Sequence, residues 1–552
     1  MDDSSPEPVG GARVRRRVGG ALVLLAACAP AADDARLADG PPSAPAHPPV
    51  ATSVGGMVVS GSAYATEAGV RMLEAGGNAV DAAVAAAFAL AVAEPTQSGL
   101  GGRTQILLRS ADGAVHGIDG TTQVPAGYDA AAAPRGEHGH GAVAIPGTVA
   151  ALARAVEEHG SLDLATVVAP ARAWALDGIL LPEGEAGRIA TIAPQLDPDS
   201  ELARIFLRAD GGAPEAGSRI HQPDLARLLE QIGREGATAF YRGRVARRIA
   251  EDMAAHGAFV TEADLASYRA VDSEIGRGAF DGAELIGSYL PASGVTVIEI
   301  MQILDALPLG SDGMARRHGT LVAALLAGFD DRASAEGTPA DEAVAWLTSD
   351  SLALRRAWEG LARVESARPA REDAEAPFTT HVSVADTFGN VVALTQSLGP
   401  TLGARVVTPG LGFVYASTLG GYLEQGAPGD RPWSSQAPLI AVRDGRPVLV
   451  MGGAGARRIL SAMVGTLLHV FEDGQSLEEA MAQPRLHPTG GMVLVEEGWP
   501  GAAGLANLGF AIEPRERTYF ARLNAVEILP DGTFRGVGEP RWPESAAGGP
   551  RQ

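Results

Sequence analysis

The segment of the chain best suited to chemistry is Thr379-Thr380-His381, at the start of an alternating apolar run. A threonine hydroxyl is a weak nucleophile unless a base stands beside it. One solution is an N-terminal threonine, whose own α-amine takes the hydroxyl proton, and an internal threonine becomes N-terminal only when the preceding peptide bond breaks. The polar segment 336–375, low in strand signals, precedes Thr379 and suits such a cut. Taken alone, the trio is more typical of an ordinary strand.

The elements that must position this threonine alternate between helices and hairpins. Paired apolar runs with turn residues between them predict hairpins at 106–108 with 115–118, 381–385 with 391–396, 440–442 with 448–451, and 524–529 with 533–537. A further strand is predicted at 57–60, and helices alternating with short loops over 146–306. Thr66 and Asn78 are predicted to cap two successive helices. Two sheets covered by helices on both sides would fit these elements.

Composition excludes several functional classes. The chain has 552 residues, of which 46% are hydrophobic, enough for a sizeable core. The net charge is −22, and no basic block follows the first twenty positions, so nucleic-acid binding is not expected. Cys28 is the single cysteine, which excludes an internal disulfide and a cysteine-based metal site.

The N-terminal region reads as a targeting segment. Arginines between Arg13 and Arg17 precede an apolar stretch at 18–27, too short for a bilayer span of about 20 residues. The stretch ends in Leu-Ala-Ala-Cys28, which resembles a bacterial lipobox. Residues 1–28 are therefore predicted to be an export signal, 29–52 a flexible linker, and the protein to lie in the bacterial cell envelope or periplasm, attached to membrane only by lipid on Cys28. An ordinary signal peptide with a chance cysteine is the alternative.

Short motifs spread over the chain resemble those of the γ-glutamyltransferases, which are N-terminal-nucleophile hydrolases. The matching segments occur in the family's order from about residue 53 to residue 541: Ala65-Thr66-Glu67-Ala68-Gly69, Gly76-Gly77-Asn78-Ala79-Val80-Asp81, Glu94-Pro95, Ser98-Gly99-Leu100-Gly101-Gly102, Ile145-Pro146-Gly147-Thr148, Ala169-Pro170-Ala171, Phe240-Tyr241, Leu265-Ala266-Ser267-Tyr268, Thr379-Thr380-His381, Arg431-Pro432, Ser434-Ser435, Gly452-Gly453, and Pro484-Arg485 with His487.

This resemblance implies a fold and a division of the chain. The fold would be α/β, a four-layer αββα sandwich. One precursor would cut itself between Phe378 and Thr379, giving a large subunit over 53–378 and a small subunit over 379–552. The partners would be these two subunits and a small amide or peptide substrate. No cofactor and no metal are expected.

The resemblance also assigns catalytic roles. Thr379 would be the autoprocessing residue and the nucleophile. Ser397 stands where the family has a second threonine whose hydroxyl bonds the nucleophile, and serine keeps that hydroxyl. Gly455 and Ala456 stand where two glycines offer backbone N–H groups to the oxyanion, a role alanine can fill if the backbone angle tolerates its methyl group.

At the donor-binding positions the chain departs from the family. Ser434 and Ser435 match the pair that holds the donor's α-carboxylate, although they could also be a polar loop. Thr121 stands where the family has the arginine that grips this carboxylate. Gly421 stands at the acidic position that grips the α-amine, and Gly399 replaces an asparagine.

Two arginines, Arg103 beside the glycine-rich turn and Arg405 after Ser397, could compensate for these losses, although each could instead be solvated or structural. Three functions therefore remain open from the sequence. The first is a self-processing amidohydrolase or acyltransferase with altered donor specificity. The second is a genuine γ-glutamyl enzyme with a rewired pocket, and the third is an inactive surface-anchored binding homologue.

Overall fold

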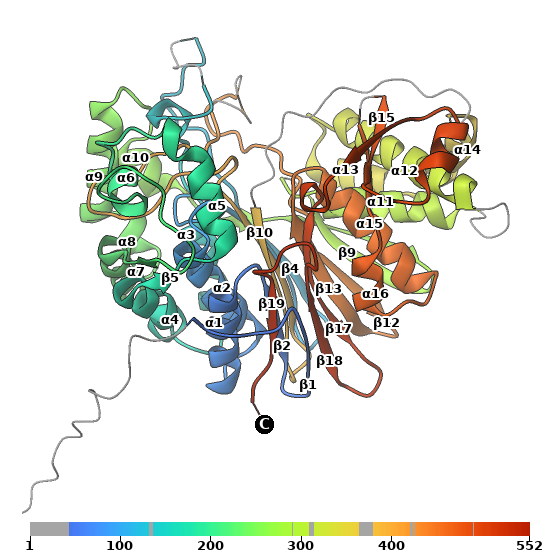
Figure 1. Ribbon diagram of the computed structural model, residues 1–552, viewed down its shortest axis with the longest axis horizontal. Helices are drawn as coiled ribbons and strands as arrows, with labels where there is room; N and C mark the ends of the chain where they lie inside the picture. Colours follow the sequence, from blue (N-terminus) through green and yellow to red (C-terminus); the bar gives the residue numbers. More distant parts are fainter. Residues whose placement is uncertain are drawn as a thin grey trace, which may run out of the picture. The chain divides into compact units, whose positions relative to one another are not determined.

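The computed structural model describes residues 44–131, 136–289, 291–307, 314–363, 379–419, 423, 426–489 and 491–551. Two seven-stranded sheets stand face to face between layers of helices (Figure 1). In spatial order the first sheet contains β19 (Ala546–Gly548), β2 (Met57–Ser60), β10 (Thr379–Ala385), β11 (Val391–Ser397), β3 (Arg103–Arg109), β4 (Val115–Gly120) and β7 (Val271–Asp272). The second contains β1 (Val50–Ser53), β18 (Phe534–Gly538), β17 (Arg522–Ile528), β13 (Arg446–Ala454), β12 (Leu439–Arg443), β9 (Ala283–Tyr289) and β8 (Glu274–Phe280).

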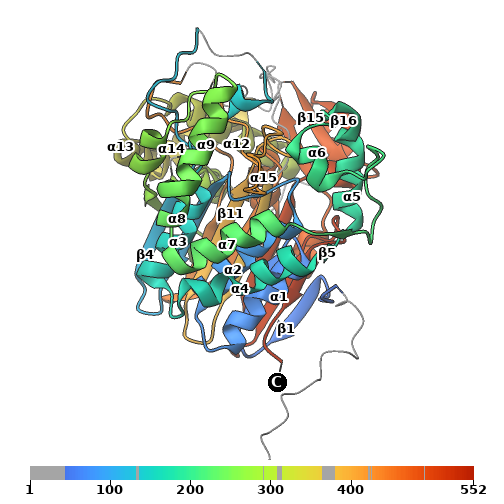
Figure 2. The same ribbon diagram turned by 90° about the vertical axis from the view of Figure 1, so that its left-hand side faces the viewer.

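Three apolar cores hold these layers together. Alternating side chains of both sheets, among them Val59, Leu107 and Val450, fill the space between the sheets. Helices α1 (Ala63–Glu74), α2 (Ala79–Ala93), α3 (Thr148–His159), α4 (Leu164–Asp177) and α7 (Pro223–Glu235) cover the first sheet (Figure 2). Helices α11 (Gly294–Asp305), α12 (Met314–Ser334), α15 (Arg458–Phe471) and α16 (Leu477–Ala482) cover the second. The expected αββα sandwich is confirmed.

The remaining elements extend the outer layers. Their bounds are β5 (Ile179–Leu180), α5 (Glu183–Ile192), α6 (Glu201–Phe206), β6 (Arg219–Ile220), α8 (Thr238–Tyr241), α9 (Gly243–Ala255), α10 (Glu262–Ser267), α13 (Ala340–Leu347), α14 (Asp350–Arg363), β14 (Leu486–Thr489), β15 (Met492–Glu496), α17 (Ala502–Asn507) and β16 (Ala511–Arg515), with 3-10 turns at η1 (His140–Ala142), η2 (Ala193–Gln195) and η3 (Arg517–Tyr519).

Strands from both sides of Thr379 interleave in the first sheet. β10, which begins at Thr379, lies between β2 and β11, and β3 and β4 follow β11. Residues before and after 379 therefore share one hydrogen-bonded sheet, so a cut at this point would leave two chains joined through the core. All four predicted hairpins are present in the structure.

The beginning of the ordered body lies earlier than the sequence predicted. Residues 50–52 were predicted to belong to the flexible linker. They form part of β1, which pairs with β18. The carbonyl oxygens of Pro48 and Pro49 accept hydrogen bonds from the N–H groups of Ala547 and Gly538. A proline lacks an N–H but keeps its acceptor, so it can still dock on a sheet edge. Residues 1–43, including Cys28, lie outside the described residues.

Helix starts were predicted in part. Asn78 caps α2 as expected, because its side chain accepts the N–H groups of Val80 and Asp81. The cap predicted at Thr66 is wrong, since α1 begins at Ala63 with Ser62 at the N-cap. The Thr66 hydroxyl instead donates to the carbonyl oxygen of Ala546, a tertiary contact that helix propensity does not reveal.

The stretch 146–306 contains strands that the sequence analysis missed. β8 and β9 form an antiparallel hairpin there, with Asp281 and Gly282 at its turn. Both turn residues have positive φ, 45° and 71°. An aspartate-glycine pair is a hairpin signal, but short strands between many helices offer little periodicity.

Candidate active site

Four positions aligned across the end of the first sheet form the candidate site. Thr379 of β10 pairs with Ser397 of β11, and Ser397 pairs with Arg103 of β3. Thr121 directly follows Gly120, the last residue of β4, which pairs with Thr104 beside Arg103. Directly opposed residues on neighbouring strands point to the same face of a sheet. We call these four residues the Thr379 row.

The Thr379 row faces the space between the two sheets. His381, two residues after Thr379 and so on the same face, lies against Gly452 of β13, where an added Cβ would come within 2.4 Å of the imidazole. β13 continues from Gly452 to Ala454, which pairs with Arg522. Arg522 in turn bonds the carbonyl oxygen of Thr379. The end of β13 therefore lies beside the candidate nucleophile.

Thr379 is 7% exposed and hydrogen-bonded through its side chain. Its Oγ1 lies 3.1 Å from Oγ of Ser397. That Ser397 oxygen also accepts the backbone N–H of Gly399 at 3.0 Å. Gly399 has a φ of 88°, a conformation that glycine adopts without strain. The Gly399 turn and Ser397 thus fix the direction of the threonine hydroxyl.

A buried ion pair supports the main chain at Thr379. Arg522, 2% exposed, donates to the carbonyl oxygen of Thr379 at 3.2 Å and to the carboxylate of Glu94 at 2.8 Å. Burial opposes ionisation of Glu94, yet Arg522 holds the pKa of this carboxyl below its usual range. Sequence reasoning missed Arg522, although a charged Glu94 at the end of an apolar helix indicates a buried partner.

His381 is a buried structural residue. Burial, together with the nearby Arg522 cation, lowers its pKa to about 3, so the imidazole is neutral at pH 7. Its two ring nitrogens lie 2.8 and 3.0 Å from the hydroxyls of Thr395 and Ser383. Both nitrogens are engaged within the fold, so we assign His381 no part in proton transfer.

The turn after β13 provides the candidate oxyanion groups. Gly455 has a φ of 137° and Ala456 a φ of 55°. A Cβ on Gly455 would lie 2.8 Å from Cα of Ala521, so this position requires glycine. Ala456 tolerates its methyl group in the left-handed region, at a strain of about 1–2 kcal/mol. The backbone at Ala456 therefore tolerates the methyl group, as the oxyanion role requires, but with some strain.

Ser434 and Ser435 are buried in the loop that precedes β12. Ser434 receives the N–H of Gln436 on its Oγ, 3.2 Å away. The Gln436 side chain donates to the carbonyl oxygen of Thr395, two residues before Ser397. These bonds bring the serine pair close to β11, the strand that carries Ser397.

Thr121 follows β4, at the end of the row opposite Thr379, and is fully buried. Its N–H donates to Asp119 at 2.7 Å, and its Oγ1 has no hydrogen-bond partner among the described residues. Asp119 pairs with Arg431 at 2.6 Å. The positive charge of Arg431, which lies beside the serine loop, is therefore neutralised by Asp119.

The remaining predicted site residues lie far from the Thr379 row or outside the described ranges. Arg405 was a candidate to replace the family arginine that binds the donor's carboxylate. It donates to Gln195 at 3.0 Å and has a φ of 58°. Gly421 and Phe378 lie outside the described residues, so their placement stays a prediction.

One cluster in the described part of the chain is close enough to hold a metal ion: His140, Asp252 and His256. The two imidazoles are stacked, with centroids 3.8 Å apart and planes 7° from parallel. Nitrogen lone pairs lie in the ring plane, so parallel rings do not direct them at one ion. The stacked pair instead flanks Asp252, which accepts the Thr408 hydroxyl at 2.6 Å.

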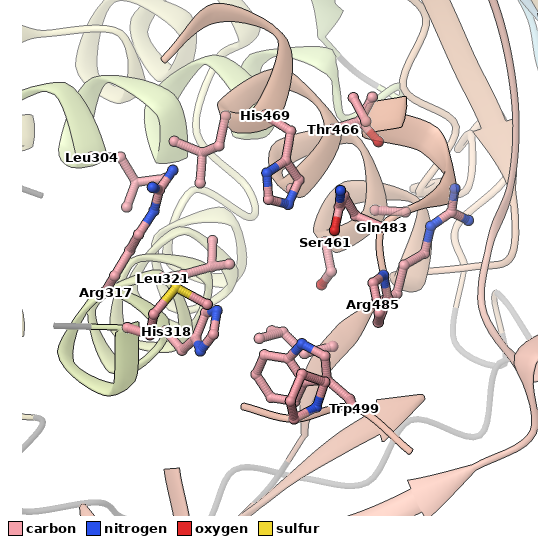
Figure 3. A pocket seen from close by; sticks show the side chains of 18 residues that line it. Leu304, Arg317, His318, Leu321, Ser461, Thr466, His469, Gln483, Arg485 and Trp499 are labelled. Atoms are coloured by element: carbon pink, nitrogen blue, oxygen red, sulfur yellow. The ribbon is translucent and has the colours of Figure 1, made fainter. Parts of the chain in front are cut away.

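A cavity of about 250 Å³ lies on the outer side of the second sheet, between α12 and α15 (Figure 3). Its two arginines are already neutralised, Arg317 by Asp473 and Arg485 by Glu539, each at 2.8 Å. None of its lining residues belongs to the Thr379 row. We therefore do not assign the acyl donor to this cavity.

The chain resembles known proteins over most of its length. The sequence model of the γ-glutamyltranspeptidase family matches residues 65–549. Acylase ACY 1 proenzyme of Pseudomonas sp. (strain V22) is 34% identical over 88% of this chain and 92% of the relative. Glutathione hydrolase proenzyme of Escherichia coli K12 is 30% identical over 95% and 97%. The crystal structure of cephalosporin acylase from Bacillus halodurans superposes with a TM-score of 0.83 at 25% identity, covering 91% of this chain and 97% of that one.

The match to the family model covers nearly all of the described body, and the fold agrees with that of the cephalosporin acylase structure. This chain belongs to the γ-glutamyltranspeptidase family of amidohydrolases and acyltransferases.

Proposed function

We propose that the chain cuts itself before Thr379 and then uses this threonine to hydrolyse, or transfer the acyl group of, an amide that is not an ordinary γ-glutamyl compound. The observation that carries the proposal is the position of Thr379. It is the first residue of β10, its hydroxyl bonds Ser397, and the end of β13 lies beside it.

The proposed cut uses the threonine hydroxyl. Oγ1 of Thr379 attacks the carbonyl carbon of Phe378, and the peptide nitrogen leaves as the α-amine of Thr379. An ester then joins Phe378 to the hydroxyl oxygen. Water hydrolyses this ester, which releases the Phe378 carboxylate and restores the hydroxyl. Because β2, β3 and β10 share one sheet, the two products stay together.

The proposed turnover reuses the same atoms. The α-amine of Thr379 takes the proton from Oγ1, which attacks the acyl carbon of the substrate. The resulting oxyanion would lie against the N–H groups of Gly455 and Ala456. The protonated amine then gives its proton to the leaving nitrogen. An acyl ester on Thr379 remains, and water or a second amine resolves it.

The donor preference is inferred from what the pocket lacks. A γ-glutamyl group carries a carboxylate and an ammonium on one carbon, and both lose water on binding. Thr121 cannot form a bidentate charged pair with the carboxylate. Gly421 and Gly399 supply no side-chain partner. The relatives named as an acylase proenzyme and a cephalosporin acylase support an acyl group of another kind.

We expect the processed enzyme to be poor on γ-glutamyl p-nitroanilide. Hydrogen bonds to charged groups contribute about 1.5–3 kcal/mol each, so the loss of two corresponds to about 100-fold or more. A panel of acyl p-nitroanilides, compared by kcat/KM, tests this. A γ-glutamyl value of roughly 10⁴ M⁻¹s⁻¹ or above, in the usual enzyme range, would contradict it and favour a rewired γ-glutamyl enzyme.

The inactive binding homologue makes a different prediction for the same preparation. Intact-mass analysis separates the two, because a self-cutting enzyme gives a chain that begins Thr-Thr-His and an inert homologue stays one chain. The intact hydroxyl pair of Thr379 and Ser397 favours the enzyme.

We also propose export with a lipid anchor on Cys28. Within the described ranges, every helix is too short or too polar to cross a bilayer. The support is the basic, apolar and Leu-Ala-Ala-Cys order of residues 13–28. Cys28→Ser is expected to move the protein from the membrane fraction to the soluble fraction after cell lysis. Unchanged membrane association in Cys28→Ser would leave the anchor without support.

A further inference from the structure

The cavity between α12 and α15 is a preformed space that the proposed chemistry of Thr379 does not use. Its volume is about 250 Å³. Its walls come from helices α11, α12, α15 and α16 and from the chain just before β14 and after β15 (Figure 3). Because an apolar cavity of about 150 Å³ holds one benzene molecule, this one has room for a ligand of roughly ten non-hydrogen atoms.

A glycine inside a helix leaves one wall of this cavity open. Gly465 lies in the middle of α15, where glycine is less favourable than alanine because a more flexible backbone must be ordered. The residue lines the cavity, and a Cβ added to it would have no other atom within 4 Å. The space therefore stays empty at a position where a larger residue would fit and would also favour the helix.

The lining combines an aromatic corner with aliphatic side chains and a few polar groups. The rings of His318 and Trp499 have centroids 4.5 Å apart and planes at 56° to each other. Leu304 and Leu321 line the same space. Thr466, 3% exposed, offers a hydroxyl, and Nδ1 of His318 has no hydrogen-bond partner among the described residues. An aromatic ligand with one hydrogen-bonding group matches this lining.

The charges around the cavity are balanced within the protein. Arg317 pairs with Asp473, and Arg485 pairs with Glu539. Burial, together with the nearby Arg317 cation, lowers the pKa of His318, so this imidazole is neutral at pH 7. A cationic ligand would meet two arginines, and an anionic one would compete with the carboxylates that already hold them. The cavity therefore favours an uncharged ligand.

Two connections run from the cavity to the candidate active site, and the first is α15 itself. This helix begins at Arg458, and the N–H of Ile459 donates to the carbonyl oxygen of Ala456 at 3.0 Å. The turn that holds Gly455 and Ala456 is thus bonded to the first turn of the helix, and later turns of the same helix line the cavity. A ligand that contacts α15 therefore acts on an element fixed to the candidate oxyanion groups.

The second connection is Arg485, which lines the cavity and is 6% exposed. Its guanidinium donates to the carbonyl oxygen of Ala521. Gly455 packs against Ala521, since an added Cβ would lie 2.8 Å from its Cα. The next residue, Arg522, donates to the carbonyl oxygen of Thr379. One cavity residue thus supports the backbone that adjoins both the oxyanion turn and the candidate nucleophile.

We propose that this cavity is an effector site, which binds a small uncharged aromatic compound and thereby raises the rate of the reaction at Thr379. The rate effect rests on the proposed function of Thr379, whereas the binding does not. A ligand that contacts α12, α15 and Arg485 together opposes their relative movement. It therefore stabilises the position of the Gly455 turn that an oxyanion donor needs.

The binding test uses the purified protein and three probes of similar size: indole, benzoate and cyclohexanol. In titration calorimetry, indole is expected to bind with a Kd of roughly 0.1–1 mM, which is usual for a ligand of this size. Benzoate is expected to bind at least about tenfold more weakly, because its charge loses water without gaining a free partner. Cyclohexanol is expected to bind about three- to tenfold more weakly, because it lacks ring contacts. No indole binding, or equal binding of indole and benzoate, would overturn the proposal.

Gly465→Leu tests whether indole binds in this cavity. The leucine side chain would occupy the space, so this variant is expected to keep or raise its Tm and to bind indole at least about tenfold more weakly. Gly187→Leu in α5 is the matched control. Gly187 also has no atom within 4 Å of an added Cβ but does not line the cavity, so its variant is expected to bind indole like the wild type. Undiminished binding in Gly465→Leu would refute the site.

A second variant decides if Gly465→Leu does not fold. Trp499→Leu removes one ring of the aromatic corner, and it is expected to bind indole and cyclohexanol equally well. A preference for indole that persists in Trp499→Leu would place the ligand elsewhere and refute the site.

The effector role is tested by kinetics on the best amide substrate. Saturating indole is expected to raise kcat of the processed wild type about fivefold, at the lower end of usual couplings between sites, and to leave Gly465→Leu unaffected. Indole that competes with the substrate, or that binds without changing kcat, overturns the effector role. A wild type that stays uncut and inactive overturns the function of Thr379 instead, and calorimetry on that uncut protein then decides the binding site alone.

Discussion

Thr379→Ala is expected to stay a single uncut chain and to lose at least about 10⁴-fold in amide hydrolysis. The substitution removes the only atom that can attack the Phe378 carbonyl in the proposed cut, and with it the nucleophile of turnover. Removal of a covalent nucleophile typically costs four to six orders of magnitude. Intact-mass analysis and kcat/KM on the best anilide measure the two effects in one preparation.

Thr379→Ser is the matched control for this prediction. Serine keeps a hydroxyl that can bond Ser397, so we expect slower but complete processing and measurable turnover. If Thr379→Ala is still cut between residues 378 and 379, another protease makes the break, and self-processing is refuted. If it stays uncut but retains wild-type activity, Thr379 is not the nucleophile.

Gly455→Ala is expected to lose about 3 kcal/mol of unfolding free energy and about 10²–10³-fold in kcat. Two causes act together. A Cβ would lie 2.8 Å from Cα and 2.9 Å from Cβ of Ala521, and φ of 137° is unfavourable for alanine. The turn would have to shift, and a displaced oxyanion donor costs that range of rate. Denaturant unfolding and single-turnover kinetics measure the two effects.

Two further substitutions separate these causes. Ala456→Gly, at φ of 55°, removes strain without adding atoms and is expected to stabilise the protein by about 1 kcal/mol. Gly474→Ala has a φ of 64° but no atom within 4 Å of its new Cβ, so it should cost about 1 kcal/mol and leave kcat unchanged. A Gly455→Ala variant no worse than Gly474→Ala would show that Ala521 yields and that the turn is not closely packed.

The local elements were largely predictable from the sequence. Period-two alternation and an Asp-Gly or Gly-Asn turn located the β10–β11 and β17–β18 hairpins. The Asn78 cap followed from its own side-chain chemistry. The β8–β9 hairpin, the early start of α1 and the docking of 50–52 on β18 were not predicted, because each depends on partners far along the chain.

The sequence by itself indicated the family and predicted both the nucleophile and the absence of the residues that bind the donor's charged groups in that family. Those conclusions depend on residue types and their order, which are local properties. Only the tertiary structure showed where the two candidate arginines lie. It aligned Arg103 with Thr379 through β11 and tied Arg405 to Gln195.

The structure alone also revealed how the candidate nucleophile is held. Arg522 and Glu94 lie 428 residues apart in sequence, yet they form the ion pair beneath Thr379. The φ of Ala456 likewise depends on packing around the turn. Strand register and buried charge pairing follow from packing of the whole chain, since no local pattern encodes which distant side chains will share one desolvated site.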